Sequence, residues 1–592
     1  MQEPKKGASF LLEMVSPEEI FTPEDLNDEQ KMIGETAASF VEKDVLPVLD
    51  EIEENHRFDL TVSLLKKAGE LGLLAGDVPE AYGGLGLDKI TTMLVTEKFA
   101  LARSFALSFG AHVGIGTLPI VFFGNEEQKK KYLPKLASGE KIAAYALTEP
   151  SSGSDALSAK TTARLNESGT HYILNGEKQW ITNSGFADVF VVYAKVDGDQ
   201  FTAFIVDRDT PGVSTGPEEK KMGIKGSSTR TLILEDAPVP VENVLGEIGR
   251  GHVIAFNILN IGRYKLAAGA VGSAKRGIEL AARYAMEREQ FKTKIGHFPL
   301  IQAKLGEMAM RTYAAEGMIY RTVGLFDEMM AYLGEKIEDG REAARGIAEY
   351  AIECSLNKVY ATEVLDYVVD EAVQIHGGYG FMSEYEVEKM YRDSRINRIF
   401  EGTNEINRLL VPGTLVKKAM RGELDLLGAA NRLQQELLSM MPSAVDGERF
   451  AQEKDMLDKA KKIFLMVAGL GVQKYGEKLE QEQEILAGVA DVIAHIFAME
   501  TALLRAQKAV NRMGEDKARG HIDLATAVVY TAFEKIEALA KDMLQHMESG
   551  DVLRTQLSVL RKLTRREAID IIALRRTIGR RQLQAGAYTT GA

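Results

Sequence analysis

The strongest candidate for chemistry in this sequence is a carboxylate set between an apolar pair and a glycine. Glu401 follows Ile399 and Phe400 and precedes Gly402 and Thr403. Gly402 permits a sharp backbone turn, and Thr403 is a typical N-cap for a helix that begins at the next residue. A carboxylate in such a connection can point into an apolar pocket, where burial raises its pKa and lets it accept a proton near neutral pH. Taken alone, a Glu-Gly-Thr triplet is more typical of an exposed surface.

Four other segments carry residues that suit a cofactor or a substrate. They are Tyr145 to Asp155, Trp180 to Asn183, Glu287 to Phe291, and Gln374 to Gly380. Each is weak by itself: the first is typical of a Ser/Gly-rich loop, Trp180 of a core aromatic residue, and the last of a plain turn. In this order and at these separations, together with Glu401, they resemble the acyl-CoA dehydrogenase family of flavoenzymes. The resemblance covers about residues 25 to 415, and the long C-terminal continuation is similar to the long-chain and very-long-chain branch.

The resemblance implies an FAD-dependent removal of two hydrogens from the carbons next to a thioester carbonyl. Glu401 is then the base that takes the α-proton, while the β-hydrogen leaves as hydride to the flavin. The backbone N–H of Glu401, with a flavin ribityl hydroxyl, is implied to hydrogen-bond the thioester oxygen. Some family members carry their base at a position that matches Arg263 or a residue near it. Arg263 is cationic and cannot accept a proton, which leaves Glu401 as the only good candidate.

The same resemblance implies which residues contact FAD. Those expected around the flavin ring and just after the base are Tyr145, Leu147, Thr148, Ser154, Trp180, Thr182, Thr403 and Glu405. Arg288 and Phe291 are expected to reach the FAD of a neighbouring subunit, and the further expected contacts are Gln302, Gln374, Gly377 and Gly378. Many relatives carry Gln where this chain has Glu405, so the role of Glu405 stays open.

Two small residues bear on the substrate. Ala106 and Gly110 are four apart and would share one helix face. Medium-chain relatives carry larger polar side chains at the matching positions, so the resemblance implies a deep apolar channel for a long acyl chain. The alternative is that the small residues only allow close helix packing.

The other expected substrate contacts are Ser154, Gly402, Asn260 and Arg263. By the resemblance, the last two face the bound thioester from a helix. For Arg263, an ordinary ion pair is an equally good interpretation.

Composition sets wider limits on function. The chain has 592 residues, which is too long for one core, and its hydrophobic content of 45% and charged content of 27% are ordinary for a globular protein. A net charge of −14 gives no indication of nucleic-acid binding. The single cysteine, Cys354, fits a reducing compartment and is interpreted as a buried apolar residue. The nine His residues lack metal-ligand spacing, so no metal site is predicted.

No targeting or membrane-spanning segment is expected. The N-terminus lacks the apolar stretch of a signal peptide, and the longest apolar run, Ile463 to Val472, is far shorter than the roughly 20 residues of a span. We therefore expect a cytoplasmic protein, with contact to a membrane surface as an additional hypothesis.

Proline placement and periodicity predict a mainly α fold with an inserted β domain. Five of the 15 prolines fall between residues 150 and 240, whereas long later stretches lack them and can form long helices. Asn175-Gly176 and Asp197-Gly198 are typical hairpin turns, the second joining strands at Val189 to Tyr193 and Phe201 to Val206. The expected domains are 26–147 (α-helical), 148–245 (middle β, barrel-like), 246–412 (four-helix bundle), 413–445 (linker) and 446–592 (an additional helical domain).

The C-terminal unit carries no catalytic motif. Met456, Ala460, Phe464 and Val467 recur at helical spacing and predict a core-facing stripe. By the resemblance this unit covers the surface where shorter relatives join dimer to dimer, so a homodimer is expected. The last helix is basic, with Arg554, Arg561, Lys562, Arg565, Arg566, Arg575, Arg576, Arg580 and Arg581. It suits either an anionic membrane surface or, as the preferred interpretation, pairing with the acidic body.

The leading hypothesis is a long-chain acyl-CoA dehydrogenase of fatty-acid β-oxidation that passes electrons to electron-transferring flavoprotein. An acyl-CoA oxidase shares the base and the flavin but reduces oxygen. A scaffold or assembly factor on the same fold is the third hypothesis. The intact Glu401, Trp180 and Arg288 argue against a purely structural role.

Overall fold

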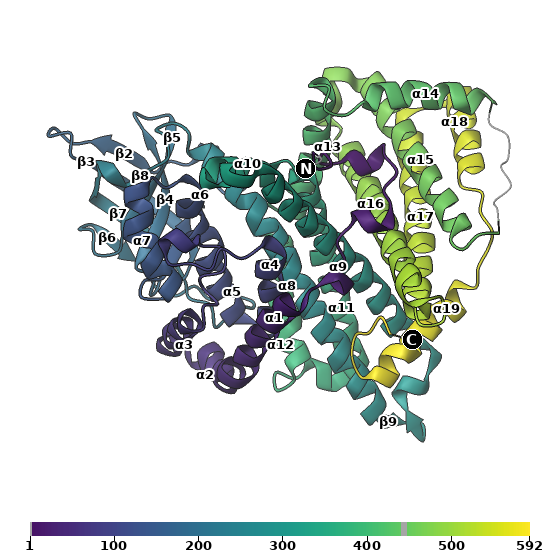
Figure 1. Cartoon of the computed structure of the whole chain (residues 1–592), viewed down its shortest axis with the longest axis horizontal. Helices are drawn as coiled ribbons and strands as arrows, with labels where there is room; N and C mark the ends of the chain where they lie inside the picture. The colour runs from purple at the N-terminus through teal and green to yellow at the C-terminus, as the bar shows by residue number, and fades with distance from the viewer. Residues whose placement is uncertain (1–2, 440–446, 592) are drawn as a thin grey trace.

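The computed structural model describes residues 3–439 and 447–591. The protein is mainly helical, with one β domain at one end, a central bundle of long helices and a C-terminal helical unit at the other end (Figure 1). Residues 440–445 of the expected linker lie outside the described residues. The boundary expected after residue 412 falls inside a helix, α13, which spans Asn404–Met420.

The first half of the chain builds a helical domain and then the sheet. The helices are α1 Asp28–Phe40, α2 Leu49–Asn55, α3 Phe58–Glu70, α4 Lys89–Phe99, α5 Ser104–Gly110, α6 Leu118–Phe123 and α7 Glu126–Ser138. The strands are β1 Ala143–Ala146, β2 Thr162–Leu165, β3 His171–Thr182, β4 Val189–Val196, β5 Gln200–Asp207, β6 Val213–Thr215, β7 Thr229–Pro240 and β8 Val244–Leu245. A left-handed turn at Asp197-Gly198 joins β4 to β5, so this predicted hairpin is confirmed.

The hairpin predicted at Asn175-Gly176 is wrong. Strand β3 runs through both residues, and its partner β7 continues alongside with a register shift between Leu174 and Gly176. The Asn175 side chain reaches Asp236 of β7, donating from Nδ2 to Oδ1 at 3.0 Å. The Asn-Gly pair therefore forms a β-bulge rather than a turn. The sheet order is β6-β7-β3-β2-β4-β5-β8, with β1 added parallel to β4.

The second half is helical apart from a short ribbon, β9 Glu289–Gln290 and β10 Thr293–Lys294. The central bundle contains α8 Gly251–Glu287, α9 Pro299–Leu333, α10 Gly340–Ala348, α11 Ala351–His376, α12 Glu386–Ser394 and α13. The C-terminal unit contains α14 Leu426–Ser439, α15 Ala451–Tyr475, α16 Gln483–Met513, α17 Arg519–Met547, α18 Gly550–Leu563 and α19 Ile571–Ala585. The predicted stripe on α15 is buried in the core, which confirms its interpretation.

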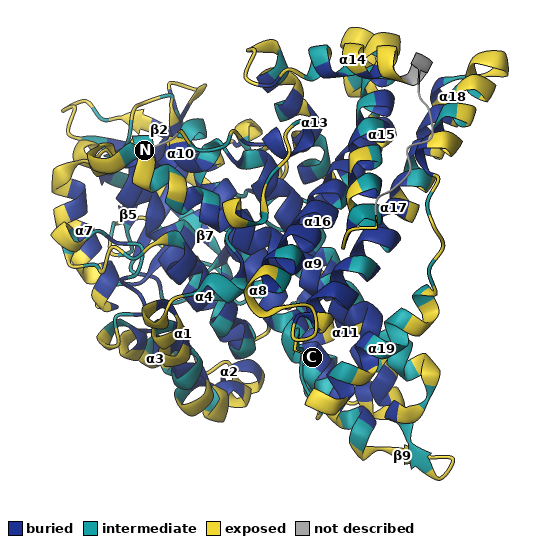
Figure 2. Ribbon diagram, turned by 45° about the vertical axis from the view of Figure 1, so that its right-hand side comes forward, coloured by how far each residue is buried: buried dark blue, intermediate teal, exposed yellow. Residues whose placement is uncertain are grey.

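The C-terminal unit shares a hydrophobic core with the central bundle, which makes it an integral part of the fold. Buried residues of α9, α11 and α13 pack with those of α15, α16 and α17 (Figure 2). The chain before α1 also joins this core: the Phe10 ring packs against Phe497 with the two rings tilted, and the Lys508 ammonium donates to the backbone oxygen of Ile20 at 2.7 Å. No motif in the sequence indicated this contact. Cys354 is buried and free, as expected.

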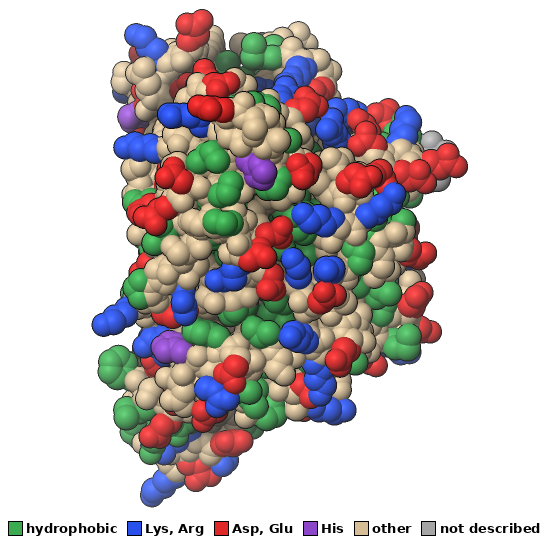
Figure 3. All heavy atoms as spheres, turned by 90° about the vertical axis from the view of Figure 1, so that its left-hand side faces the viewer, with side chains coloured by type: hydrophobic (Ala, Val, Ile, Leu, Met, Phe, Trp, Pro, Cys, Tyr) green, Lys and Arg blue, Asp and Glu red, His purple; other side chains and the backbone are tan. Residues whose placement is uncertain are grey.

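The basic C-terminal segment is two helices, α18 and α19, rather than one. Several of its cations turn toward the protein: Arg575 pairs with Glu307 at 2.9 Å, Arg581 with Asp523 at 2.8 Å, and Arg566 with Glu537 at 3.1 Å. This supports pairing with the acidic body for these three residues. On the face shown in Figure 3, charges of both signs are interspersed.

Two segments are long and apolar enough to cross a membrane, Ser104–Phe123 and Gln483–Met513. The longest apolar run was therefore misjudged as Ile463 to Val472. Both segments are 78% buried inside the protein, and the core helices of a soluble protein pass the same test of length and composition.

Candidate active site

Glu401 sits in a strained turn before α13. Its backbone φ is 59° and that of Gly402 is 78°. Thr403 caps the helix as expected, because its side-chain oxygen accepts the Ile406 N–H at 3.2 Å. A left-handed conformation is costly for a residue with a side chain, so the surrounding structure must hold it in place.

Three buried side chains from three helices hold this turn. The Lys358 ammonium of α11 donates to the Gly402 backbone oxygen at 2.8 Å and to Asn404 Oδ1 at 2.7 Å. Arg263 of α8 donates from Nε to the Glu401 backbone oxygen at 3.3 Å, and Asn407 Nδ2 donates to the Gly402 oxygen at 2.8 Å. The carbonyl groups of the turn are thus fixed, while the Glu401 side chain stays free to act.

Glu401 is partly buried, and its carboxylate is incompletely paired. Its Oε2 has no hydrogen-bond partner among the residues that the structure describes. Burial raises the pKa of Glu401 to about 7, against the opposing positive charges of Arg263 and Lys358. A carboxyl group with this pKa is well matched to proton abstraction near neutral pH.

Gly262 of α8 faces the base. A Cβ added to Gly262 would lie 2.4 Å from Glu401 Oε2. Any side chain at this position would displace the carboxylate from the place that it takes here. Because glycine has no side chain, position 262 of α8 cannot supply a second base opposite Glu401. This agrees with the assignment of Glu401 as the single catalytic base. The sequence motifs did not indicate Gly262 or Lys358.

The pKa of Glu401 predicts the pH dependence of the chemical step. Only the deprotonated carboxylate accepts the α-proton, so the rate of flavin reduction by acyl-CoA should rise with pH and level off above a midpoint near 7. Anaerobic stopped-flow measurements of flavin absorbance across the range would give the midpoint. A rate that is flat through pH 7 would contradict the assignment.

Lys358 provides the matched control for this prediction. Its positive charge lowers the pKa of Glu401, so Lys358→Met should move the midpoint upward by about one pH unit. Lys358→Arg keeps the charge and should hold the midpoint near the wild-type value. A merely structural role for Lys358 would lower flavin content or stability without moving the midpoint.

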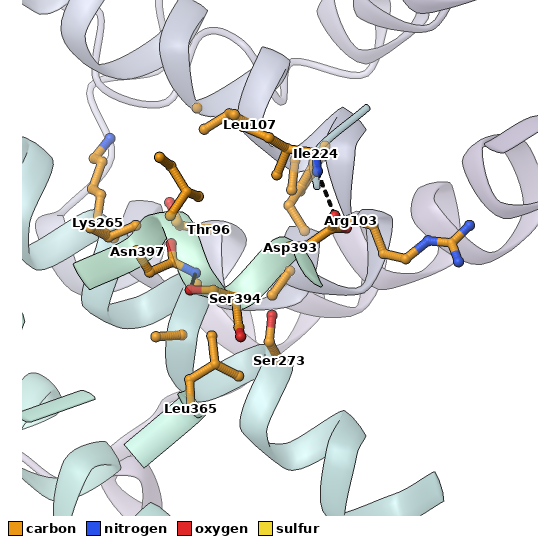
Figure 4. A pocket seen from close by; sticks show the side chains of 18 of the residues that line it. Thr96, Arg103, Leu107, Ile224, Lys265, Ser273, Leu365, Asp393, Ser394 and Asn397 are labelled. Atoms are coloured by element: carbon orange, nitrogen blue, oxygen red, sulfur yellow. Dashed lines mark hydrogen bonds between the residues drawn. The ribbon is translucent and has the colours of Figure 1, made fainter. Parts of the chain in front are cut away.

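A cavity of about 230 Å³ opens beside Glu401. It runs between α5 and α8, with α11 and α12 completing the wall. Predicted residues Ala106, Gly110 and Thr182 line it together with Glu401. Figure 4 shows Ser273, Leu365 and Ser394 around one part of the cavity and the hydrogen bond from the Ile224 N–H to Asp393.

Helix α8 gives the direction and length of the cavity. The residues that line it from this helix include Gly262, Leu266, Gly269, Ser273 and Arg276, which recur at helical spacing on one face. The stripe runs from Gly262 to Arg276, a rise of 14 residue steps or about 21 Å at ~1.5 Å per residue. A Cβ added to Gly110 or Gly269 meets no described atom within 4 Å. The small residues therefore leave open space rather than serving only close helix packing.

Trp180 and Thr182 form a suitable face for a planar ring. Trp180, the only tryptophan of the chain, lies at a bulge of β3 with φ 59°. Its side chain is 59% exposed, whereas a core aromatic residue would be buried. Thr182, two residues later, lines the cavity. The Tyr145 hydroxyl is buried without a partner in the described part of the chain. An uncovered aromatic ring and an unpaired hydroxyl fit an isoalloxazine ring bound near the base.

A buried ion pair between Lys178 and Glu149 fixes the loop after β1. The Lys178 ammonium donates to Glu149 at 2.7 Å and to the Leu147 backbone oxygen at 3.2 Å. Thr148 pairs through its backbone oxygen with the Gln179 N–H at 2.8 Å. This holds the backbone of Leu147 and Thr148 in place, whereas Ser154 is exposed.

A second group of expected cofactor residues lies at the far end of α8. Arg288 follows the last residue of the helix, about 38 Å along its axis from Gly262. The Arg288 guanidinium lies over the Tyr379 ring at 5.6 Å, beside Gly377 and Gly378.

The other cofactor residues expected in this region differ in exposure. Phe291 is 89% exposed, and Gln374 is also exposed. Gln302 is covered by α19 and contacts Arg580 at 3.4 Å. One chain therefore presents two separate half-sites.

Asn260 and Arg263 pair with each other behind the turn, where Arg263 Nη1 donates to Asn260 Oδ1 at 2.9 Å. Both are buried, and neither is among the described residues that line the cavity. Their direct contact with substrate stays a prediction. Glu405 is exposed on the first turn of α13. Within the described residues there is no group of three His, Cys, Asp or Glu that could hold a metal ion.

Comparison with known proteins places this geometry in a family. Residues 27–140, 144–237 and 249–415 match the N-terminal, middle and C-terminal domains of acyl-CoA dehydrogenases, and residues 459–562 match a further acyl-CoA dehydrogenase C-terminal domain. A probable acyl-CoA dehydrogenase of Bacillus subtilis (strain 168) is 64% identical over 586 residues, covering 99% of this chain and 98% of that protein.

Two further relatives indicate the same family. The crystal structure of an acyl-CoA dehydrogenase complexed with FAD from Bacillus anthracis is 62% identical, with a TM-score of 0.98, and covers 99% of this chain and 100% of that chain. The very long-chain specific acyl-CoA dehydrogenase of Macaca fascicularis is 36% identical over 535 residues, covering 86% of this chain and 76% of that protein. The fold and the resemblance predicted from sequence are confirmed, and the chain belongs to the acyl-CoA dehydrogenase family.

Proposed function

We propose that this protein is an FAD-dependent acyl-CoA dehydrogenase that acts on long-chain acyl-CoA. The observation that carries the proposal is the Glu401 carboxylate, with a buried and unpaired oxygen, at one end of a cavity about 21 Å long. The reaction converts the acyl thioester to the trans-2-enoyl thioester by loss of the α-proton and the β-hydride. The flavin, when bound, supplies the acceptor for the hydride.

The residues of the chain bind, orient and deprotonate the substrate. Glu401 takes the α-proton, and Gly262 leaves room for the carboxylate to lie against α8. The backbone N–H of Glu401 is available to the thioester oxygen, because Arg263 and Asn407 hold the carbonyl side of the same turn. A donor fixed at this place stabilises the negative charge that develops on the oxygen as the proton leaves. Trp180, Thr182 and the loop at Leu147 and Thr148 are the residues that would hold the flavin.

The length of the cavity supports a long-chain substrate. An extended carbon chain advances about 1.2 Å per bond, one third of the ~3.6 Å that an extended peptide residue spans over three bonds, so ~21 Å holds about 17 bonds. Burying each methylene contributes about 0.8 kcal/mol. A chain that fills the cavity therefore binds much more tightly than a short chain, which leaves most of the apolar wall uncovered.

The proposed function also implies two protein partners, a second copy of this chain and an electron acceptor. We propose a homodimer, because the half-site around Arg288 is too far from Glu401 on the same chain to share a flavin with it, and a second copy can supply it. We also propose electron-transferring flavoprotein as the electron acceptor. Bleaching of the flavin during anaerobic addition of palmitoyl-CoA, but not of butyryl-CoA, tests the substrate assignment.

A further inference from the structure

An ion pair lies at the far end of the cavity. Arg276 of α8 and Glu386 of α12 both line the cavity. Arg276 donates from Nε to Glu386 Oε1 at 3.0 Å and from Nη2 to Oε2 at 2.8 Å. The two side chains are 25% and 29% exposed, so the pair faces solvent as well as the cavity.

The wall leading to this pair is different in character. Gly269, Ala270, Leu365, Val369 and Met390 line the cavity before it. An apolar plug of packed side chains would give the cavity a fixed depth, because such packing resists displacement. A partly exposed ion pair, even a bidentate one, can open without leaving its charges unsolvated, since water reaches both ions when they separate. The far end is therefore the part of the wall where charged side chains that water can solvate replace apolar packing.

We propose that the Arg276–Glu386 pair is a gate at the end of the acyl channel, which stays closed over chains that fit and parts for longer ones. The proposal rests on the proposed function and adds to it the residues that set the upper chain length. A chain longer than the channel displaces the Glu386 side chain, and its terminal carbons emerge into water. Carbons beyond the gate leave no apolar wall to bury against, so they add no affinity.

Removal of the gate gives the first test. In Glu386→Ala, the ratio of kcat/KM for docosanoyl-CoA to that for palmitoyl-CoA should rise about threefold to fivefold, the range expected for losing one partly exposed ion pair. Glu279→Ala is the matched control, because Glu279 also pairs with Arg276, at 2.9 Å, yet is not among the described residues that line the cavity. The control ratio should stay at the wild-type value. Flavin content and circular dichroism check that both variants fold.

A second measurement locates the chain end without turnover. Acyl-CoAs of two lengths, each with a pyrene at the terminal carbon, are bound to the wild-type holoenzyme and quenched with iodide. The label should be shielded on a chain that ends inside the channel and quenched on one that extends past Arg276. Shielding of both labels, or an unchanged ratio in Glu386→Ala, would overturn the gate while palmitoyl-CoA still reduces the flavin. Failure of every acyl-CoA to reduce the flavin would overturn the proposed function itself.

Discussion

Replacing Glu401 by Gln is expected to lower the rate of flavin reduction by palmitoyl-CoA by about 1,000-fold, within the usual contribution of a general base. The amide has nearly the shape of the carboxylate, so it keeps the contact with Gly262, but it cannot accept the α-proton. FAD content and acyl-CoA binding should be retained. Single-turnover reduction under anaerobic conditions measures the loss, and the perturbation of the flavin spectrum measures binding.

Glu353→Gln is the matched control for Glu401→Gln. Glu353 is another buried glutamate whose pKa burial raises, here to about 6, but its carboxylate accepts the Ala8 N–H at 2.6 Å, away from the cavity. Its replacement should leave the reduction rate near the wild-type value. Equal rates for wild type and Glu401→Gln would show that the base lies elsewhere.

Replacing Gly110 by Gln is expected to shift the substrate preference to shorter chains. A Cβ at this position points into open space in the wall of the cavity, so a Gln side chain projects into the channel. If it prevents four methylenes from being buried, the loss is about 3 kcal/mol at ~0.8 kcal/mol each, or roughly 100-fold in kcat/KM for palmitoyl-CoA. Octanoyl-CoA should be affected much less. The ratio of kcat/KM for the two substrates is the measurement.

Gly413→Gln controls for the general effect of a Gln in a helix. Gly413 lies in α13, is exposed, and a Cβ there also meets no described atom within 4 Å, but it is not among the described residues of the cavity wall. This variant should keep the wild-type preference. An unchanged chain-length profile in Gly110→Gln would show that this channel does not set the chain-length preference.

Residues whose role depends on nearby sequence could be predicted, and residues whose role depends on tertiary contact could not. Glu401, Gly402 and Thr403 form a local unit of base, turn and helix cap, and the structure places all three as expected. Gly262 and Lys358 meet that unit only because α8 and α11 pack beside it. A lone glycine or lysine inside a helix carries no local signature of such a contact.

The wrong hairpin at Asn175-Gly176 has a related cause. An Asn-Gly pair favours a tight turn only if the following residues can fold back on the preceding strand. Here β7 pairs with β3 on both sides of the pair, so the extra residue becomes a bulge instead. The same long pairing carries Trp180 at a second irregularity, where its side chain is left exposed. Sheet partners distant in sequence decided both outcomes.

The most direct test of the account is an anaerobic titration of the purified protein with saturated acyl-CoAs of increasing length, following flavin absorbance. We expect a yellow protein whose flavin is bleached by palmitoyl-CoA and hardly at all by butyryl-CoA, because only the long chain fills the cavity beside Glu401. A protein that holds FAD but is bleached by none of these thioesters would contradict the proposed dehydrogenation.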